Sequence, residues 1–167
     1  LPTGSAEYLP GVMNAAVRDF VLTVRGKSCH GAHPEQGIDA IVASAGIVTA
    51  LQSVPSRRFA PTTPTIVTIG TINGGTAENV VAGEVVMTGT LRALDKGVMA
   101  ELKKIVSETC ENAAQGFGAI AEINYTTEYP VLRNDYELTE STVGKIKKLI
   151  GKENVLEMDA PSLGADD

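Results

Sequence analysis

Stretches in which β-branched and apolar residues dominate, in part alternating with polar ones, predict four β-strands. They cover residues 19–25, 65–72, 79–94 and 119–126. Gly83 and Gly89 lie inside the third and longest stretch, where we expect bends or bulges.

Apolar residues recur at three- and four-residue steps in two other stretches, which predicts amphipathic helices. The first runs from Ile38 to residue 51, and we expect Pro55 to end it. The second begins after Asp95, a typical N-cap, and ends at the glycines 116 and 118. Over residues 17–128 the order is therefore β-α-β-β-α-β. This order predicts the α+β, ferredoxin-like fold, in which two helices cover one face of a four-stranded antiparallel sheet.

The two ends of the chain do not fit this unit. Residues 1–16 mix proline and glycine with scattered apolar residues, so we expect a loop or an incoming linker. Residues 129–167 offer one short helix near 138–150 and one short strand near 154–158, which is too little for a domain. We therefore expect residues 17–128 to form a complete domain and both ends to belong to another. The first residues lack the features of a signal peptide, and we expect the chain to begin inside a longer protein or after processing.

Composition narrows the possible partners. Fourteen basic and twenty acidic side chains give the 167 residues a formal charge of −6. Nucleic acids and anionic membrane surfaces bind clustered Lys and Arg, so we expect neither as a partner. No apolar run approaches the ~20 residues that a membrane-spanning helix needs, and we expect a cytoplasmic protein. Two cysteines are too few for a disulfide framework, and two histidines are too few for a multi-histidine metal centre.

The densest chemistry lies in residues 26–41, which leave a strand and enter a helix. A Cys29–His30 nucleophilic pair is geometrically poor, because adjacent side chains of an extended chain point in opposite directions. A metal site from Cys29, His30 and His33 would need a fourth ligand. His30 is also suited to donate a hydrogen bond to a substrate carbonyl or to the oxyanion formed from it. In the alternative, neither histidine has a catalytic or binding role: one caps the nearby helix and the other faces solvent. The residues alone favour this alternative.

Three other segments carry less specific chemistry. Residues 73–80 contain the glycines of a phosphate loop, but they lead into a strand rather than into the helix that such a loop needs, so Asn79 needs no function there. Arg92 is suited either to an ordinary salt bridge or to clamping a carboxylate. Asp166 and Asp167 are either half of an acidic metal or acid/base site or simply exposed.

Short motifs along nearly the whole chain together resemble one family. They are Asp19-Phe20, Gly26-Lys27, His30-Gly31-Ala32, Pro34, Gly37, Asp39-Ala40-Ile41, Thr68-Ile69-Gly70, Gly74-Gly75, Asn79-Val80-Val81, Gly89-Thr90, Arg92, Tyr129-Pro130, Asn134-Asp135 and Leu163-Gly164-Ala165-Asp166-Asp167. This ordered set is similar to that of the aminoacylase and hippurate-hydrolase amidohydrolases. These are di-zinc exopeptidases whose catalytic domain carries an inserted dimerisation (lid) domain.

The resemblance implies that residues 17–128 are the lid and that the metal ligands and general-base glutamate lie outside this chain. It implies a homodimer through the lid, with zinc or another divalent metal in the complete enzyme and none in this chain alone. By position, His30 matches the lid histidine that reaches into the partner's active site and donates to the scissile carbonyl. Asn79 and Arg92 match the positions that bind the substrate's carboxylate. The implied substrates are N-acyl amino acids or small peptides, and the isolated chain is expected to be inactive.

Other points stay open. Asp166 stands where the family usually has the longer glutamate, and His33 falls at a variable position, so neither receives a role. A non-catalytic regulatory module that binds small ligands is the main alternative, because a fold does not decide function. A hydrolase based on Cys29 is a third hypothesis.

A dimer also has a physical reason, because edge strands expose unpaired backbone groups that a second copy can pair.

Overall fold

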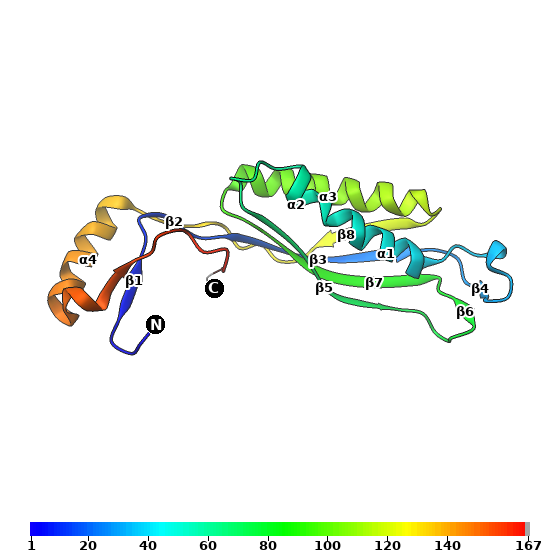
Figure 1. Ribbon diagram of the computed structural model, residues 1–167, viewed down its shortest axis with the longest axis horizontal. Coiled ribbons are helices and arrows are strands. Elements are labelled where there is room, and N and C mark those ends of the chain that lie inside the picture. The colour runs from blue at the N-terminus through cyan, green and yellow to red at the C-terminus, as the bar shows by residue number, and fades with distance from the viewer. Residues whose placement is uncertain (166–167) are drawn as a thin grey trace.

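The structure is a computed structural model of the chain, and it describes residues 1–165. Its main body is a four-stranded antiparallel sheet with the order β5-β7-β3-β8. The strands are β3 (Ala16–Arg25), β5 (Thr65–Gly74), β7 (Glu84–Ala93) and β8 (Ile120–Tyr125). Helices α1 (Ala40–Leu51) and α3 (Lys96–Gly116) lie against each other on one face of this sheet (Figure 1). The predicted α+β fold, with two helices on one face of a four-stranded antiparallel sheet, is confirmed.

The hydrophobic core lies between this sheet and the two helices. Alternate residues of β3 and β7 point into it and are at most 1% exposed: Phe20, Leu22, Val24, Val85, Met87 and Leu91. The inward faces of α1 and α3 complete it with Ala43, Ile47, Leu51, Leu102, Val106, Cys110 and Ala114. The opposite face of the sheet is mostly polar, although Val21 and Val86 lie on it. There the hydroxyls of Thr71 and Thr88 form a hydrogen bond of 2.6 Å across neighbouring strands.

Side-chain caps fix where the two long helices begin. The Asp39 carboxylate accepts hydrogen bonds from the backbone N–H groups of Ile41 and Val42, so α1 begins two residues later than the apolar periodicity predicts. Asp95 caps α3 in the same way, as predicted. At the other end of α3, Gly118 adopts φ +74°, a left-handed conformation that favours glycine.

Two predicted boundaries are wrong. Pro55 does not end the helical backbone but lies inside a second short helix, α2 (Ser53–Arg57). It is tolerated because the N–H groups of a first helical turn need no partner within the helix. The third predicted strand, 79–94, is broken at Gly83 into β6 (Val80–Val81) and β7. The bulge beside Gly89 lies on the neighbouring strand β5, between Ile69 and Thr71.

The two ends of the chain pair with each other rather than with the main sheet. β1 (Ala6–Tyr8) runs parallel to β10 (Val155–Glu157), and β2 (Gly11–Asn14) runs antiparallel to β9 (Leu132–Asn134). The loop expected over residues 1–16 is thus wrong for β1 and β2, because their hydrogen-bonding partners lie at the other end of the chain.

Helix α4 (Tyr136–Ile150) packs against β10 and is followed by a 3-10 turn over Lys152–Asn154. Both lie at the end of the molecule remote from the helices of the main body (Figure 1). Over residues 1–165, no helix combines the length and the apolar character that crossing a membrane requires.

Candidate functional site

Two of the three predicted site residues meet at one end of the molecule. β4 (Cys29–His30) pairs antiparallel with β6, which sets His30 opposite Val80. The backbone N–H of Gly31 then donates to the carbonyl of Asn79 at 2.7 Å. This two-stranded ladder is the tip of the molecule farthest from α4 (Figure 1). His30 and Asn79 are both exposed there, so their side chains are presented to whatever approaches the tip.

The backbone around His30 forms a closed loop, which we call the His30 hook and define as residues 26–38. Its two ends are joined, because Lys27 and Ile38 exchange backbone hydrogen bonds of 2.8 and 2.9 Å. Its base is attached to the main sheet, because the N–H of Gly26 donates to the carbonyl of Gly83 at 2.8 Å. Closed in this way, the hook holds His30 at a fixed place relative to the sheet.

The inside of the hook is tightly packed. A 3-10 turn over Pro34–Gln36 leads to Gly37, where a Cβ atom would stand 2.5 Å from the Cys29 Sγ atom and 2.7 Å from the Lys27 carbonyl oxygen. The position therefore accepts glycine alone, although its backbone conformation is open to any residue. The half-buried thiol of Cys29 donates to the carbonyl of His33 at 3.3 Å.

The His30 imidazole has one occupied and one free nitrogen. The backbone N–H of Ala32 donates to its Nδ1 atom at 3.1 Å. Since Nδ1 accepts, the neutral ring carries its proton on Nε2. Within residues 1–165 no group bonds Nε2, so the ring offers an unused N–H donor at the tip. This is the geometry that an oxyanion donor needs.

The alternative in which a histidine caps the nearby helix does not hold. Asp39, not a histidine, caps α1, and the side chain of His33 makes no capping hydrogen bond to the 3-10 turn. The His33 ring lies 6.2 Å from that of His30, between centroids, and its Nδ1 atom is 3.7 Å from a Glu35 carboxylate oxygen. His33 is thus a second exposed imidazole on the hook.

The third predicted residue, Arg92, lies at the other end of the sheet. Strand β7 runs from Glu84, beside the hook, to Arg92, a separation of about 26 Å for eight residues of extended chain. Arg92 is half-buried, and its Nη1 atom donates to the carbonyl of Leu163 at 2.9 Å. One chain therefore does not bring Arg92 to His30 and Asn79.

Sequence reasoning missed Arg18, which joins the strand that enters the main sheet to the segment that leaves it. Val17 and Tyr129 exchange backbone hydrogen bonds of 3.0 and 3.1 Å. The buried guanidinium of Arg18 donates to both of these carbonyls and pairs with the Glu128 carboxylate. It also lines a groove of about 550 Å³ beside the first turn of α3. A usable signal existed, because Arg18 falls on the inward period of β3, where an apolar residue is expected.

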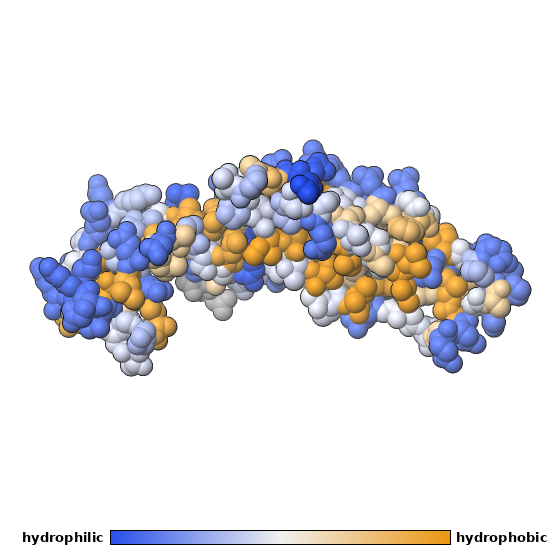
Figure 2. Space-filling view, viewed as in Figure 1, coloured by the Kyte–Doolittle hydropathy of each residue, from blue (hydrophilic) through white to orange (hydrophobic). Residues whose placement is uncertain are grey.

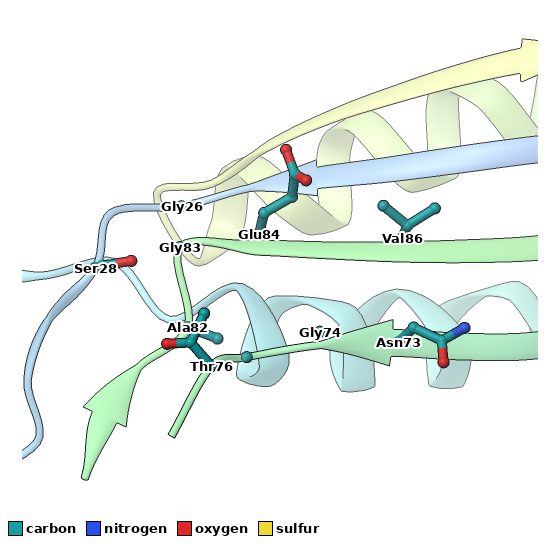
Figure 3. A pocket seen from close by; sticks show the side chains of 10 residues that line it. Gly26, Ser28, Asn73, Gly74, Thr76, Ala82, Gly83, Glu84 and Val86 are labelled. Carbon is teal, nitrogen blue, oxygen red and sulfur yellow. The ribbon is translucent and has the colours of Figure 1, made fainter. Parts of the chain in front are cut away.

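A hollow of about 600 Å³ lies beside the base of the hook, along the ends of strands β5 and β7. Figure 3 shows Ser28 and Thr76 at one end of it, with Glu84, Val86 and Asn73 along strands β7 and β5. None of the three predicted site residues lines it. The glycine-rich segment 73–76 lines it, but that segment leads into β6 rather than into a helix, so the helix N-terminus of a phosphate site is missing here.

The described part of the chain does not fit a metal ion. Nowhere in residues 1–165 do three His, Cys, Asp or Glu side chains come together as a ligand set. In the hook, the Cys29 thiol is bonded to a carbonyl, and the His30 Nδ1 atom accepts from an N–H group. Asp166 and Asp167 lie outside the described residues.

Comparison with known proteins identifies the main body. Residues 13–117, more than half of the chain, match the model of the peptidase dimerisation domain. The chain belongs to this family. Over 157 residues this dimerisation domain and its flanks are 36% identical to a probable hydrolase of Synechocystis sp., covering 94% of this chain and 40% of the relative. Over 165 residues they are 32% identical to N-acetyldiaminopimelate deacetylase of Exiguobacterium sibiricum, covering 99% of this chain and 44% of the relative.

Solved structures agree with the sequence relatives. The crystal structure of a dinuclear metal-binding peptidase of the M20 family from Bacillus subtilis matches with a TM-score of 0.72 at 25% identity, covering 97% of this chain and 39% of that one. The dimerisation domain and its flanks thus span about 40% of the length of the relatives they match. The resemblance to the amidohydrolases is confirmed, and the names of the relatives are those of hydrolases rather than of separate regulatory modules.

Proposed function

We propose that this chain is the dimerisation lid, with flanking pieces of the catalytic domain, of a metal-dependent amidohydrolase that cleaves the amide bond of N-acyl amino acids or small peptides. Membership of the dimerisation-domain family supports this, as does the similarity to a deacetylase of an N-acetyl compound. Zinc or another divalent metal would be held by the rest of the enzyme, and the chain alone would be inactive. The cytoplasmic location and the absence of nucleic-acid and membrane partners stay predictions.

The pairing of the chain's ends supports the division into a lid over residues 17–128 and catalytic pieces over 1–16 and 129–167. β1 pairs with β10 and β2 with β9, and none of these strands joins the main sheet. The hydrogen bonds between Val17 and Tyr129 bring the two connections side by side. An inserted domain needs this arrangement, because its host must enter and leave it at one place.

The observation that carries the catalytic proposal is the free Nε2–H of His30 at the exposed tip. When water attacks an amide carbonyl, negative charge develops on the carbonyl oxygen. A donor already held in place stabilises that charge more than it stabilises the substrate. Asn79, joined to the hook through its carbonyl, would place its side-chain amide beside the same substrate.

Two subunits are needed to complete such a site. Arg92 is bonded to Leu163, within the flanking segment of its own chain, whereas His30 and Asn79 lie at the remote tip. We therefore assign Arg92 to the active site of its own subunit, and His30 and Asn79 to that of the partner. Nη1 of Arg92 is occupied by the carbonyl, which leaves its other N–H donors for the substrate's carboxylate.

The face formed by α1 and β5 is the surface best suited to the dimer contact. β5 is an edge strand of the sheet, and the exposed side chains of Ile72 on β5 and of Ile41 and Val42 on α1 are 53%, 49% and 50% accessible. Figure 2 shows apolar side chains gathered where α1 lies beside β5. Antiparallel pairing of two β5 strands would continue the sheet across the dimer and cover these side chains. The other edge, β8, is shorter and carries Glu122 on its outer face.

Substitution of His30→Ala in the complete enzyme tests the proposal. We expect kcat to fall by roughly 10²–10³, the usual cost of one oxyanion donor, while metal content and dimerisation stay unchanged. His33→Ala is the matched control, because it removes the other imidazole of the same hook and should leave turnover near wild type. Unchanged turnover in the His30 variant would overturn the catalytic assignment.

A further inference from the structure

The His30 imidazole is held through a short chain of contacts within the hook. The Nδ1 atom of the ring accepts from the Ala32 N–H. The backbone carbonyl of His30 accepts from the N–H of His33 at 2.8 Å. Residues 30–33 thus form a tight turn, and the Ala32 amide stays beside the ring only while this turn keeps its shape. The carbonyl of His33, at the end of the turn, is the group that the Cys29 thiol bonds.

The thiol is fixed in turn by its surroundings. Cys29 is half-buried and paired with Val81 through β4 and β6. Its sulfur lies so close to Gly37 that a Cβ atom there would be 2.5 Å away. The sulfur therefore has little room to leave the His33 carbonyl. The thiol bonds a backbone carbonyl rather than a general base, and the neighbouring His30 points to the opposite side of the strand with its Nδ1 atom occupied.

We propose that Cys29 is a positioning residue for His30. Its thiol holds the His33 carbonyl, which fixes the turn that brings the Ala32 N–H to Nδ1, and this keeps the imidazole in the Nε2–H form that donates outward. The inference rests on the proposed role of His30 as oxyanion donor and adds to it the group that prepares the donor. Cys29 itself touches no reacting atom.

Nuclear magnetic resonance of the 167-residue chain measures the positioning directly. The chain contains two histidines, so ¹⁵N-histidine labelling yields few signals, and a His33→Gln variant assigns those of His30. In the wild type, the Nε2 atom of His30 should carry the proton and the Nδ1 atom should be unprotonated. Cys29→Ala should shift His30 toward a mixture of tautomers, whereas Cys29→Ser, which keeps a donor, should retain the wild-type form. Ser28→Ala is the matched control, because the Ser28 hydroxyl faces Gly83 rather than the hook.

Kinetics of the complete enzyme supply the second measurement. Cys29→Ala should lower kcat by roughly fivefold, as expected for the loss of one modest hydrogen bond, with KM and metal content unchanged. Cys29→Ser should restore kcat, and Ser28→Ala should not change it. An unaltered His30 tautomer in Cys29→Ala overturns the inference, whether or not kcat falls. So does an altered tautomer with unchanged kcat, or the loss of the Nε2–H form in Cys29→Ser.

The two proposals fail in different ways. If His30→Ala leaves turnover unchanged, the proposed function fails, whatever the tautomer measurement shows. If His30→Ala lowers turnover but Cys29→Ala leaves the His30 signals unaltered, the proposed function stands and the role of Cys29 is refuted.

Discussion

His30 lies on the β4–β6 ladder beyond one end of the main sheet, and Arg92 lies near the other end of that sheet, with the length of strand β7 between them. Eight residues of extended chain separate Glu84, beside the hook, from Arg92, a distance of about 26 Å. An N-acyl amino acid is far shorter than this, so both residues touch one substrate only if they come from two subunits.

Arg92→Lys tests the carboxylate contact. Lysine keeps the positive charge but loses the planar pair of donors, so kcat/KM should fall by about 10- to 100-fold, mainly through KM. Steady-state kinetics with a substrate and with its C-terminal amide separate a lost carboxylate contact from a general structural effect, because the amide has no carboxylate for Arg92 to bind. Wild type and variant should therefore differ little on the amide. Arg25→Lys is the control, since Arg25 lies exposed on the same sheet and pairs with Glu84 and Glu122; a loss as large as that of Arg92→Lys would refute a specific role.

Ile72→Lys tests the dimer surface. Burying an ammonium group between two β5 strands is costly, so this variant should be monomeric at micromolar concentration by light scattering. Ile120→Lys is the matched control, because Ile120 lies on the other edge strand and is 63% exposed. It should remain dimeric. A dimeric Ile72→Lys beside a monomeric Ile120→Lys would place the contact on β8 instead.

Cys110 gives a prediction on pH and stability. Burial raises the pKa of the Cys110 thiol from 9.0 to about 12, and the Glu111 carboxylate adds to this. The folded protein keeps the thiol proton while the unfolded chain loses it, so this contribution to stability is complete below pH 9 and declines as the pH rises toward 12. Between pH 8 and pH 10 the free energy of unfolding should fall by about 1.4 kcal/mol more in the wild type than in Cys110→Ala.

Urea unfolding at the two pH values measures this difference. The variant is the proper reference, because lysines and tyrosines that titrate in the same range affect both proteins alike. Parallel pH dependence in the two proteins would show that the thiol ionises as readily in the folded state as in the unfolded one.

The main sheet and its helices could be predicted because their signals are local. The alternation that buries Phe20 and Leu22, and the cap at Asp95, are readable within a few residues. β1 and β9 could not be predicted in this way, because each is stabilised by a partner at the far end of the chain. Gly83 shows a middle case. The sequence predicts a bend there, but only the pairing of β6 with β4 shows that the strand breaks.

In the candidate site, too, some features can be predicted from the sequence and others depend on the folded structure. His30 and Asn79 match positions of a family pattern, but the sequence alone does not show that the β4–β6 ladder brings them together. The occupied Nδ1 atom of His30 depends on the turn through Ala32, and the place of Arg92 depends on the return of the chain at Leu163. The contact between Arg92 and Leu163 joins distant parts of the chain, so no local pattern predicts it. The contact between Ala32 and His30 spans only two residues, but it needs the particular turn of the hook, which residue types alone do not specify.

Activity of mixed dimers tests most directly whether His30 and Arg92 serve different subunits. His30→Ala and Arg92→Ala chains of the complete enzyme are co-expressed with different tags, and the mixed dimers are compared with each variant alone. If His30 acts across the dimer and Arg92 within its own subunit, one of the two sites in each mixed dimer is intact. Mixed dimers isolated through both tags should then have about half of wild-type activity, and the unseparated mixture from random pairing of equal amounts about a quarter. If activity stays at the level of the single variants, His30 and Arg92 of one chain serve the same site, and the assignment to two subunits is wrong.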